Sequence, residues 1–338
     1  KIGMKVLVTG STGLLGSHIV ERLVAQGYQV RALARKTSDV GHLRSTGVEI
    51  VFSDIEDRNS LPPALKGISI VFHAAARVTP GWGSWQQFEA TIVRGTENLL
   101  RASADAGVWR FLQVSSGDIY GEACCKGTPA RESTPCQIAF KPDNYYQCAK
   151  LQAEKLAFDY HRQERLEVSA IRPGWVYGPR DRLLADRIAR QLEMPIVVWP
   201  GKANPRIPLL FASDVADCAI VVATSEKTVG QVYNVGPPYE VRLRDFATTM
   251  ARALGRPEPK VSFPYLMAYA ACAVMEAWSR LRRVNEMPYL TCSGLRLLNS
   301  EMLLDVSKVR KELGWEPKVS VDEGVSLYVE WRRRQKKG

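Results

Sequence analysis

Three glycines spaced three residues apart stand near the start of the sequence, where a β-branched run gives way to a helical pattern. The stretch TGSTGLLGSHIVERL places Gly10, Gly13 and Gly16 between the expected strand 5–9 and the expected helix 14–26. Glycines at such a junction let the turn close tightly and let the backbone approach a pyrophosphate, which the amides at the helix N-terminus then bind. The feature therefore predicts a dinucleotide-binding strand–turn–helix unit.

The first half of the chain continues this alternation of short β-branched runs and amphipathic stretches, which predicts βαβ units. We expect strands at 5–9, 29–34, 48–53, 68–73, 110–115, 166–171 and 231–236, and helices at 14–26, 86–106 and 145–163. The predicted fold class is α/β, a Rossmann-type doubly wound parallel sheet with a smaller interleaved C-terminal substrate-binding region. We assign residues 1–173 to the nucleotide-binding domain, to which a segment at about 208–236 returns, and residues 174–338 mainly to the substrate-binding region.

Composition excludes several classes of protein. The chain of 338 residues is 46% hydrophobic and 24% charged, which is typical of a globular protein. Its net charge of +11 favours acidic partners, but the basic runs at 279–283 and 331–337 lie in no nucleic-acid-binding motif, so we expect no nucleic-acid partner. Seven cysteines without a C-x-x-C pattern and four unclustered histidines indicate a reducing compartment and no metal site. We see no signal peptide and expect a cytoplasmic location.

Two cations follow the second expected strand. A site that prefers NAD usually has an acidic residue there to bind the adenosine ribose, whereas here Arg35 and Lys36 come first and no carboxylate precedes Asp39. Two positive charges at this corner suit a 2′-phosphate, so we predict NADP(H) as the preferred cofactor and NAD(H) as the other choice. The alternative is that both side chains only face solvent.

The stretch DNYYQCAK at 143–150 places Tyr146 and Lys150 four residues apart, on one face of the expected helix, whereas Tyr145 has Ala149 at that spacing. A nearby ammonium stabilises a phenolate and lowers the pKa of the tyrosine, and such a pair can exchange a proton with an alcohol or a carbonyl. Taken alone, the pattern also fits an ordinary surface helix. A hydroxyl after the fifth strand, which we assign to Ser116, can bind the same reacting oxygen.

The motifs TGSTGLLG, FHAAA, VSSGDIYG, Tyr146-x-x-x-Lys150 and IRPGWVYGP occur in an order that resembles the extended short-chain dehydrogenases/reductases, in the NAD-dependent epimerase/dehydratase superfamily. The resemblance continues through FASDVADCA (211–219) to the stretch at 308–324. It implies an enzyme in which Ser116 orients the substrate oxygen, Tyr146 transfers the proton, and Lys150 holds the nicotinamide ribose and tunes the tyrosine.

The cofactor contacts that we predict come from the glycine turn, the cationic corner, the ends of later strands and the tyrosine helix. Asp54 either accepts from the adenine amino group or forms a turn, and the small side chains after the fourth strand let the cofactor pass close to the backbone. The full predicted set is Gly10, Ser11, Thr12, Gly13, Leu14, Leu15, Gly16, Arg35, Lys36, Asp54, Ile55, Ala74, Ala75, Ala76, Tyr146, Lys150, Pro173 and Val176.

Two positions depart from the common pattern of the family. Ile92 stands where many members have an asparagine in an N-V-x-G-T stretch, which puts any role of that asparagine in doubt. Trp175 stands where nucleotide-sugar members often have an asparagine in R-x-x-N-V-Y-G-P. The segment around Trp175 is more similar to the 3β-hydroxysteroid dehydrogenase branch.

Four residues are our candidates for substrate binding. Trp82 and Trp85 lie in the expected loop after the fourth strand and Trp175 follows the sixth, so they predict an apolar wall, with plain packing as an equal alternative. Arg206 lies in a region where nucleotide-sugar members often keep a basic residue for the diphosphate. The three alternatives are that Arg206 binds the diphosphate, that it binds another acidic group, and that it binds nothing.

Two further segments predict partners. The apolar stretch 264–283 predicts a helix that covers the pocket or lies on a membrane surface, with a buried core helix as the alternative, which we favour over membrane contact. The family resemblance also implies a homodimer that packs residues 86–106 and 145–163 of each chain into a four-helix bundle.

The function that we predict is an NADP(H)-dependent oxidoreductase that interconverts a secondary alcohol and a ketone on a small hydrophobic, sterol-like or lipid-like substrate. The alternative is a nucleotide-sugar epimerase or dehydratase that holds NAD(P) tightly. A non-catalytic dinucleotide-sensing regulator is the third class, and we disfavour it because a sensor has no use for Ser116, Tyr146 and Lys150 together.

Overall fold

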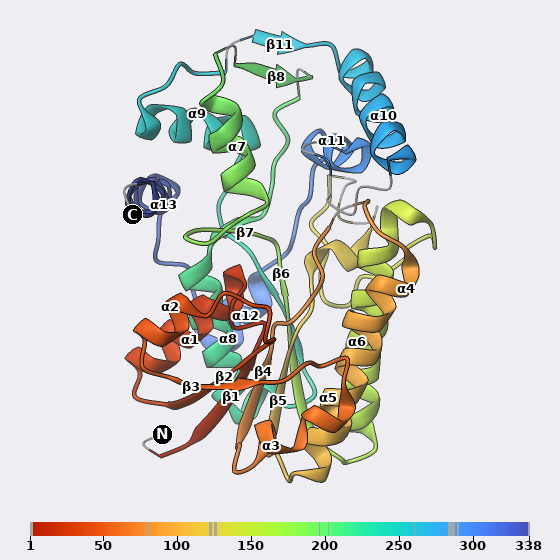
Figure 1. Cartoon of the computed structure of the whole chain (residues 1–338), viewed down its shortest axis with the longest axis vertical. Helices are drawn as coiled ribbons and strands as arrows, with labels where there is room; N and C mark the ends of the chain where they lie inside the picture. Colours follow the sequence, from red (N-terminus) through yellow and green to blue (C-terminus); the bar gives the residue numbers. More distant parts are fainter. Residues whose placement is uncertain are drawn as a thin grey trace.

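The computed structural model describes residues 3–79, 81–121, 124, 127–195, 197–201, 203–259, 261–282, 288 and 291–336. Its centre is a seven-stranded parallel sheet with the order β10-β6-β5-β4-β1-β2-β3, in the lower half of Figure 1. The strands are β1 (Lys5–Thr9), β2 (Gln29–Ala34), β3 (Glu49–Phe52), β4 (Ile70–His73), β5 (Arg110–Val114), β6 (Glu167–Pro173) and β10 (Val232–Val235). The predicted doubly wound parallel sheet is confirmed, and its strand order reverses between β1 and β4, where such sheets bind ligands.

Both faces of the sheet are covered, because successive side chains of a strand point to opposite faces. Val6 and Val8 of β1 pack in one core with Ile19, whereas Leu7 packs in a second core with Leu99. The first core lies under α1 (Leu14–Ala25), α2 (Gly41–Ser45), α8 (Ala212–Thr224) and α12 (Ser307–Leu313), and the second under α3 (Pro62–Leu65), α5 (Gly95–Asp105) and α6 (Tyr145–Arg162).

The helix that we expected at 86–106 is interrupted. It consists of α4 (Trp85–Phe88), a π-helical turn (Glu89–Arg94) and α5. Such turns form where a local contact competes with the regular helical ladder. Here Thr96 Oγ1 donates to the carbonyl of Ile92 at 2.5 Å, and α5 begins at Gly95, where a Cβ atom would lie 2.8 Å from the side chain of Ile55.

The later part of the chain forms the upper region of Figure 1. A third core there contains Tyr177, Phe246, Met250 and Tyr328. Its elements are β7 (Trp175–Tyr177) paired with β9 (Leu209–Phe211), β8 (Val198–Pro200) paired with β11 (Val261–Phe263), α7 (Leu184–Leu192), α9 (Leu243–Leu254), α10 (Tyr265–Leu281), α11 (Cys292–Leu298) and α13 (Val321–Gln335). Short 3₁₀ helices lie at Arg58–Ser60, Gly117–Tyr120, Pro142–Asn144 and Glu226–Thr228. The domain boundary at residue 173 stays a prediction.

The favoured interpretation of residues 264–283 as a core helix is wrong. The segment forms α10, whose inner side chains Ala268 and Cys272 are buried. Its outer side chains Leu266, Val274 and Leu281 are 79%, 70% and 77% exposed. The reason is that, among the residues that the structure describes, the buried side of α10 packs against α11, and Figure 1 shows the helix at the edge of the molecule. Arg283 lies outside the described residues.

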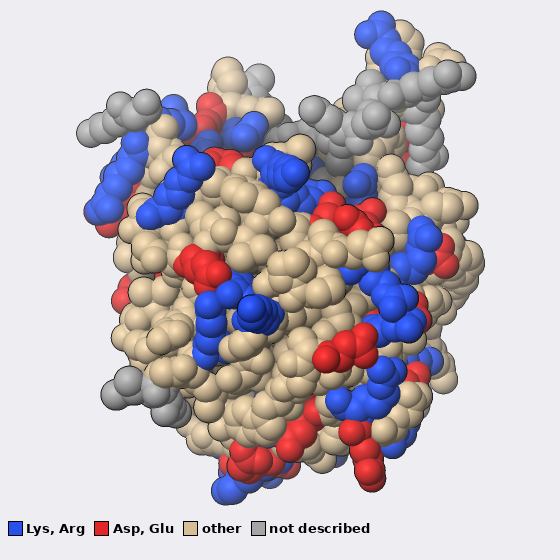
Figure 2. Space-filling view, turned by 60° about the horizontal axis from the view of Figure 1, so that its bottom comes forward, with Lys and Arg blue, Asp and Glu red and all other residues tan. Residues whose placement is uncertain are grey.

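Surface charge and helix length bear on the predicted partners. On the face in Figure 2, basic and acidic side chains alternate over the surface rather than forming a basic stripe. Within the residues that the structure describes, none of the helices has the length and apolar character needed to cross a membrane.

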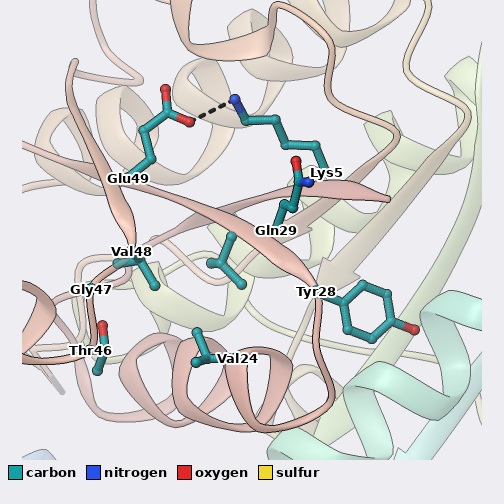
Figure 3. A pocket seen from close by; sticks show the side chains of 9 residues that line it. Lys5, Val24, Tyr28, Gln29, Thr46, Gly47, Val48 and Glu49 are labelled. Carbon is teal, nitrogen blue, oxygen red and sulfur yellow. Dashed lines mark ion pairs between the residues drawn. The ribbon is translucent and has the colours of Figure 1, made fainter. Parts of the chain in front are cut away.

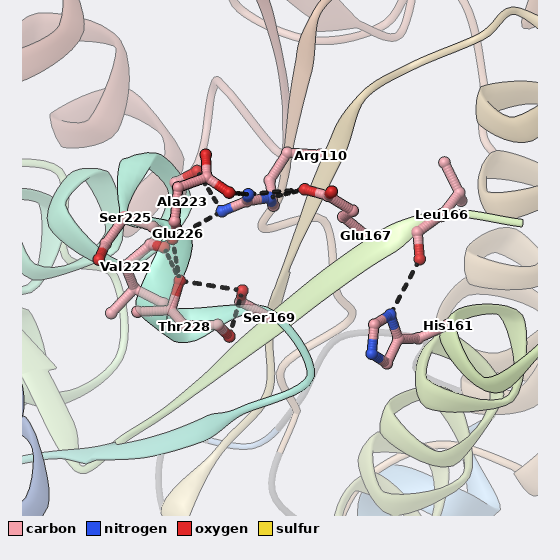
Figure 4. A network of polar contacts seen from close by, with 10 residues as sticks. All are labelled: Arg110, His161, Leu166, Glu167, Ser169, Val222, Ala223, Ser225, Glu226 and Thr228. Carbon is pink, nitrogen blue, oxygen red and sulfur yellow. Dashed lines mark hydrogen bonds and ion pairs between the residues drawn. The ribbon is translucent and has the colours of Figure 1, made fainter. Parts of the chain in front are cut away.

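A buried arginine joins three elements at the start of β5 (Figure 4). Arg110 is fully buried, and its guanidinium donates to Glu167 Oε2 at 2.6 Å and to the carbonyl of Ser225 at 2.8 Å. Glu226 adds a longer contact at 3.3 Å. The charge is thus paired and hydrogen-bonded to β6 and to the chain after α8, as a buried charge requires.

We predict that Arg110→Met lowers the free energy of unfolding by about 1–3 kcal/mol, because the substitution leaves the carbonyl of Ser225 without its donor, while the partly exposed Glu167 regains water. Urea unfolding followed by circular dichroism measures the change. Arg165→Met is the matched control, since Arg165 is exposed and lies 3.8 Å from Asp105, and it should change the value by less than about 1 kcal/mol. Equal effects of the two variants would contradict the structural role of Arg110.

Candidate active site

The glycine turn brings the ends of β1 and β4 together. Gly10 has a φ of +66°, and a Cβ atom there would lie 2.7 Å from the carbonyl carbon of Ala74 and from the nitrogen of Ala75. A Cβ atom on Gly16 would lie 2.1 Å from the Gly10 carbonyl oxygen. Only glycine fits at these two positions, so bare backbone meets the N-terminus of α1, which fits a pyrophosphate.

The cationic corner stands next to this turn. Ser11 Oγ donates to the carbonyl of Leu33 at 2.8 Å and so ties the turn to the end of β2. Arg35 and Lys36 follow directly, are exposed, and form no ion pair with any carboxylate of the described chain. Their charges are therefore available to a phosphate on a nucleotide bound at the turn.

The remaining cofactor candidates lie around the same edge. Asp54 Oδ1 accepts from the backbone N–H of Glu56 at 3.0 Å, which is the turn-forming alternative, and Ile55 is buried against Gly95. Among the other candidates, Pro173 is buried. The rest are half-buried, and they are Thr12, Leu14, Leu15, Ala74, Ala75, Ala76 and Val176.

The three predicted catalytic residues meet at the carboxyl end of β5. Lys150 Nζ donates to the carbonyl of Val114 at 2.7 Å, two residues before Ser116. Ser116 Oγ accepts from the backbone N–H of Asp118 at 3.2 Å and also hydrogen-bonds Tyr146. Helix α6 thus delivers Tyr146 and Lys150 to the strand end that carries Ser116, which is an arrangement that can hold a reacting oxygen and move a proton to it.

The expected lowering of the pKa of Tyr146 is wrong for this arrangement. Burial raises the pKa of Tyr146 above its usual value, the negative charge of Asp118 raises it further, and the hydrogen bond with Ser116 acts in the opposite direction. The ammonium of Lys150 is directed to the carbonyl of Val114 instead. The phenol therefore keeps its proton at neutral pH.

Lys150 itself is buried, with 3% of its surface exposed. Burial lowers the pKa of Lys150 to about 8, and the nearby charge of Glu154 raises it in part. Burial destabilises the charged form of the amine, so the pKa of Lys150 depends on the charges around it.

Asp118 is a site residue that our sequence interpretation missed. Burial raises the pKa of Asp118 to about 6, and the hydrogen bond with Ser116 partly opposes this shift. The carboxyl group therefore titrates close to neutral pH beside Ser116 and Tyr146. Its position in the quoted motif VSSGDIYG was the signal that could have found it.

His73 was missed as well. Its Nδ1 lies 2.7 Å from Thr9 Oγ1 and its Nε2 lies 2.8 Å from Thr96 Oγ1. Because Thr96 donates to Ile92, it accepts from His73 Nε2, and Thr9 then donates to Nδ1. Burial lowers the pKa of His73 to about 3, and the charge of Lys150 lowers it further. A neutral histidine at the end of β4 thus joins the end of β1 to the start of α5.

The predicted aromatic wall is divided between two places. Trp85 makes edge contacts with Phe140 at 4.9 Å and with Tyr145 at 5.8 Å, measured between ring centroids. Trp175 packs in a separate cluster with Tyr120. Trp82 is buried in the loop before Trp85. The cluster of Trp85, Phe140 and Tyr145 is the one beside Tyr146, and Tyr145 packs in it.

Arg206 has a carboxylate partner. Its Nε donates to Glu301 Oε1 at 2.7 Å and its Nη2 donates to Oε2 at 2.9 Å, and both side chains are partly exposed. This two-point pair neutralises the cation that a nucleotide-sugar diphosphate would need.

A pocket of about 300 Å³ lies at the other edge of the sheet (Figure 3). It is lined by residues at the amino ends of β1, β2 and β3, among them Lys5, Gln29 and Glu49. Because ligands of such sheets bind at the carboxyl ends of the strands, we assign it no role in the site.

Comparison with known proteins supports the same kind of chemistry. The model of the NAD dependent epimerase/dehydratase family matches residues 6–236. A 2-alkyl-3-oxoalkanoate reductase of Shewanella oneidensis is 26% identical over 331 residues, which cover 94% of this chain and 84% of that protein. A 3 beta-hydroxysteroid dehydrogenase/Delta 5-->4-isomerase of Mycobacterium tuberculosis is 27% identical over 338 residues, with coverage of 95% and 88%.

A solved structure extends the similarity to the whole fold. DesIV (dTDP-glucose 4,6-dehydratase) from Streptomyces venezuelae, with NAD and TYD bound, has a TM-score of 0.78 at 25% identity. The match covers 99% of this chain and 98% of that one.

The buried amine of Lys150 predicts a pH-dependent stability. Its pKa is lower in the folded chain, at about 8, than the usual 10.5, so the unfolded chain binds more protons between these values and stability rises with pH there. We expect the free energy of unfolding of the wild type, relative to Lys150→Met, to rise by roughly 3 kcal/mol across this range.

Urea unfolding at a series of pH values checks this expectation. Lys155→Met, which replaces an exposed lysine of the same helix, is the matched control and should give a difference that is independent of pH. The difference in free energy of unfolding between the wild type and Lys150→Met could instead stay constant or fall as the pH rises. Either result would contradict a lowered pKa of a buried Lys150 amine.

Proposed function

The chain belongs to the NAD dependent epimerase/dehydratase family, and from this premise we propose that it is an NADP(H)-dependent oxidoreductase acting on a hydrophobic, sterol-like or lipid-like substrate. It is an NAD(P)-dependent enzyme of the extended short-chain dehydrogenase/reductase type. The proposed reaction interconverts a secondary alcohol and a ketone.

One observation carries the choice of substrate. The start of α6, which holds Tyr146, is flanked by the aromatic rings of Trp85 and Phe140, whereas the cation expected for a sugar diphosphate, Arg206, is paired with Glu301. An aromatic wall with few free polar anchors suits a ring-rich or lipid-like molecule. The names of the reductase and of the hydroxysteroid dehydrogenase, which this chain resembles at 26% and 27% identity, support the same class.

The geometry of the three residues supports the roles that the family resemblance implies. When bound, the cofactor supplies or accepts a hydride at its nicotinamide ring. In ketone reduction, Tyr146 donates its proton to the carbonyl oxygen while Ser116 holds the same oxygen by a hydrogen bond. The ammonium of Lys150 is fixed at the end of β5 by the carbonyl of Val114, where it would hold the nicotinamide ribose, the role that the family resemblance implies. The raised pKa of Tyr146 keeps the proton on the phenol until the substrate arrives.

A nucleotide-sugar epimerase or dehydratase is the second candidate. The fold similarity to the dTDP-glucose 4,6-dehydratase favours it, because the match covers nearly all of both chains. In that case the protein would keep its cofactor during purification and would show no net redox change. The paired state of Arg206 argues against it.

A direct assay separates the two candidates. The purified protein is mixed with NADPH and a 3-ketosteroid, and absorbance at the nicotinamide band is followed. Steady consumption of NADPH supports the proposal. Conversion of a UDP- or dTDP-sugar without added NADPH, together with no consumption on the ketone, would replace it with the second candidate.

We predict that Tyr146→Phe lowers kcat by at least about 10²-fold, because it removes the proton donor. Binding of NADPH, measured by fluorescence, should stay nearly unchanged. Tyr145→Phe is the matched control, since this neighbour packs against Trp85 and Phe140, and its effect on kcat should be small. The opposite pattern would assign the chemistry to Tyr145.

We predict that Arg35→Ala weakens the binding of NADPH by about tenfold or more and leaves that of NADH almost unchanged, because a charged hydrogen bond to the 2′-phosphate is lost. Titration of both cofactors by fluorescence measures the two dissociation constants. Arg44→Ala, in α2 away from the corner, controls for the change in net charge. Equal losses for NADPH and NADH would remove the argument for NADP.

Two further expectations remain proposals. We propose a homodimer through the helices at 86–106 and 145–163, and a cytoplasmic location.

A further inference from the structure

The described side chains on the outer face of helix α10 are apolar. We call the six large side chains on this side the α10 face, and they are Leu266, Met267, Val274, Met275, Trp278 and Leu281, each at least 40% exposed. The exposed Val261 and Phe263 of β11 extend it. Apolar surface of this continuity is rare on a monomer and marks an interaction site.

The polarity of α10 is the reverse of an ordinary surface helix, whose charges face outward. Ala268, Cys272 and Glu276, spaced four residues apart, are buried toward α11. The carboxylate of Glu276 accepts from the backbone N–H of Cys292 at 2.6 Å. Glu276 is the only acidic residue between 261 and 282, so the α10 face carries no negative charge.

Positive charge lies at the C-terminal end of the same helix. The guanidinium of Arg282 stacks over the ring of Trp278, 4.3 Å from its centre. The protein as a whole has a net charge of +11. An aromatic side chain beside a cation, at the end of an apolar helix face, is the composition that binds at a lipid–water interface.

We propose that the α10 face docks on the surface of an anionic lipid membrane, with α10 lying in the interface. The helix is too short to span a bilayer, with 17 residues. A second copy of this chain fits less well, because the α10 face offers no carboxylate to pair with Arg282 of the other copy. Anionic headgroups supply that charge along the whole edge of the helix.

Helix α11 connects this surface to the candidate active site. Ser293 Oγ donates to Asp143 Oδ1 at 2.6 Å, and Arg296 Nη1 donates to Asp143 Oδ2 at 2.9 Å. Arg296 also reaches the hydroxyl of Tyr269 in α10 at 3.4 Å. Asp143 lies three residues before Tyr146. Docking would therefore hold the Tyr146 helix close to the membrane, from which, if the proposed function is right, a lipid-like substrate is drawn.

Vesicle flotation tests the docking. The full chain is mixed with vesicles of phosphatidylcholine containing about one part in three phosphatidylglycerol, and with phosphatidylcholine alone. We expect binding to the anionic vesicles that is weakened at least about tenfold in Leu266→Asp/Val274→Asp/Leu281→Asp, because three apolar anchors are lost.

The matched control carries the same change of charge elsewhere. Met194→Asp/Tyr239→Asp/Leu327→Asp replaces three exposed hydrophobic residues away from α10 and should bind within about threefold of the wild type. Thermal unfolding by circular dichroism checks that both variants fold. If the first variant does not fold, Leu281→Asp alone is used, since Leu281 ends the helix.

Several results would overturn the docking. They are an absence of wild-type binding to anionic vesicles, equal losses in both variants, and self-association of the wild type, seen by sedimentation, that the α10 variant abolishes while vesicles stay unbound. The last result would make the α10 face a contact between copies.

Activity is measured separately, on a water-soluble ketone with NADPH. The α10 variant should turn over this ketone at the wild-type rate, because none of its three changed residues touches the site. A wild type that binds vesicles but reduces no ketone would refute the proposed function and leave the docking in place. Ketone reduction without vesicle binding would refute the docking and leave the proposed function in place.

Discussion

The backbone of Gly10 lies against the backbone of Ala74 and Ala75, and the rest of the site depends on this contact. It brings together the chain that leaves β1 and the chain that leaves β4, the two paired strands at which the sheet order reverses. The hydrogen bonds of His73 to Thr9 and Thr96 then fix the same strand ends to the start of α5. These contacts hold the carboxyl ends of the strands at one edge of the sheet. A nucleotide at the glycine turn can therefore lie next to the proton donor on α6.

Local pattern was sufficient for the sheet and for the placement of Tyr146 and Lys150 on one helix face, whereas their catalytic roles with Ser116 rest on the family resemblance and stay predictions. The strands follow from β-branched runs, and the four-residue spacing of Tyr146 and Lys150 places them on one helix face whatever surrounds it. The π-helical turn could not be predicted in this way, because it depends on Thr96, which His73 holds from another strand. The ion pair of Arg206 with Glu301 could not be predicted either, because the two residues are 95 positions apart in the sequence.

The two errors of interpretation have a common physical cause. An apolar helix has the same sequence pattern whether a core or a membrane covers it, so the exposure of α10 becomes visible only when α11, which covers its buried side, is placed. In the same way, the spacing of Tyr146 and Lys150 gives their proximity but not the burial of the phenol or the charge of Asp118, and these decide the direction of the pKa shift.

The pair formed by Arg206 and Glu301 has an evolutionary consequence. As long as both side chains are present, the guanidinium is satisfied within the protein and offers little attraction to a phosphorylated molecule. Loss of the carboxylate alone would release a partly exposed, permanently charged fork that matches phosphate oxygens. If the proposed substrate class is right, one acidic side chain at this position separates a site for uncharged molecules from one that attracts phosphorylated sugars, which is a short step for divergence within one family.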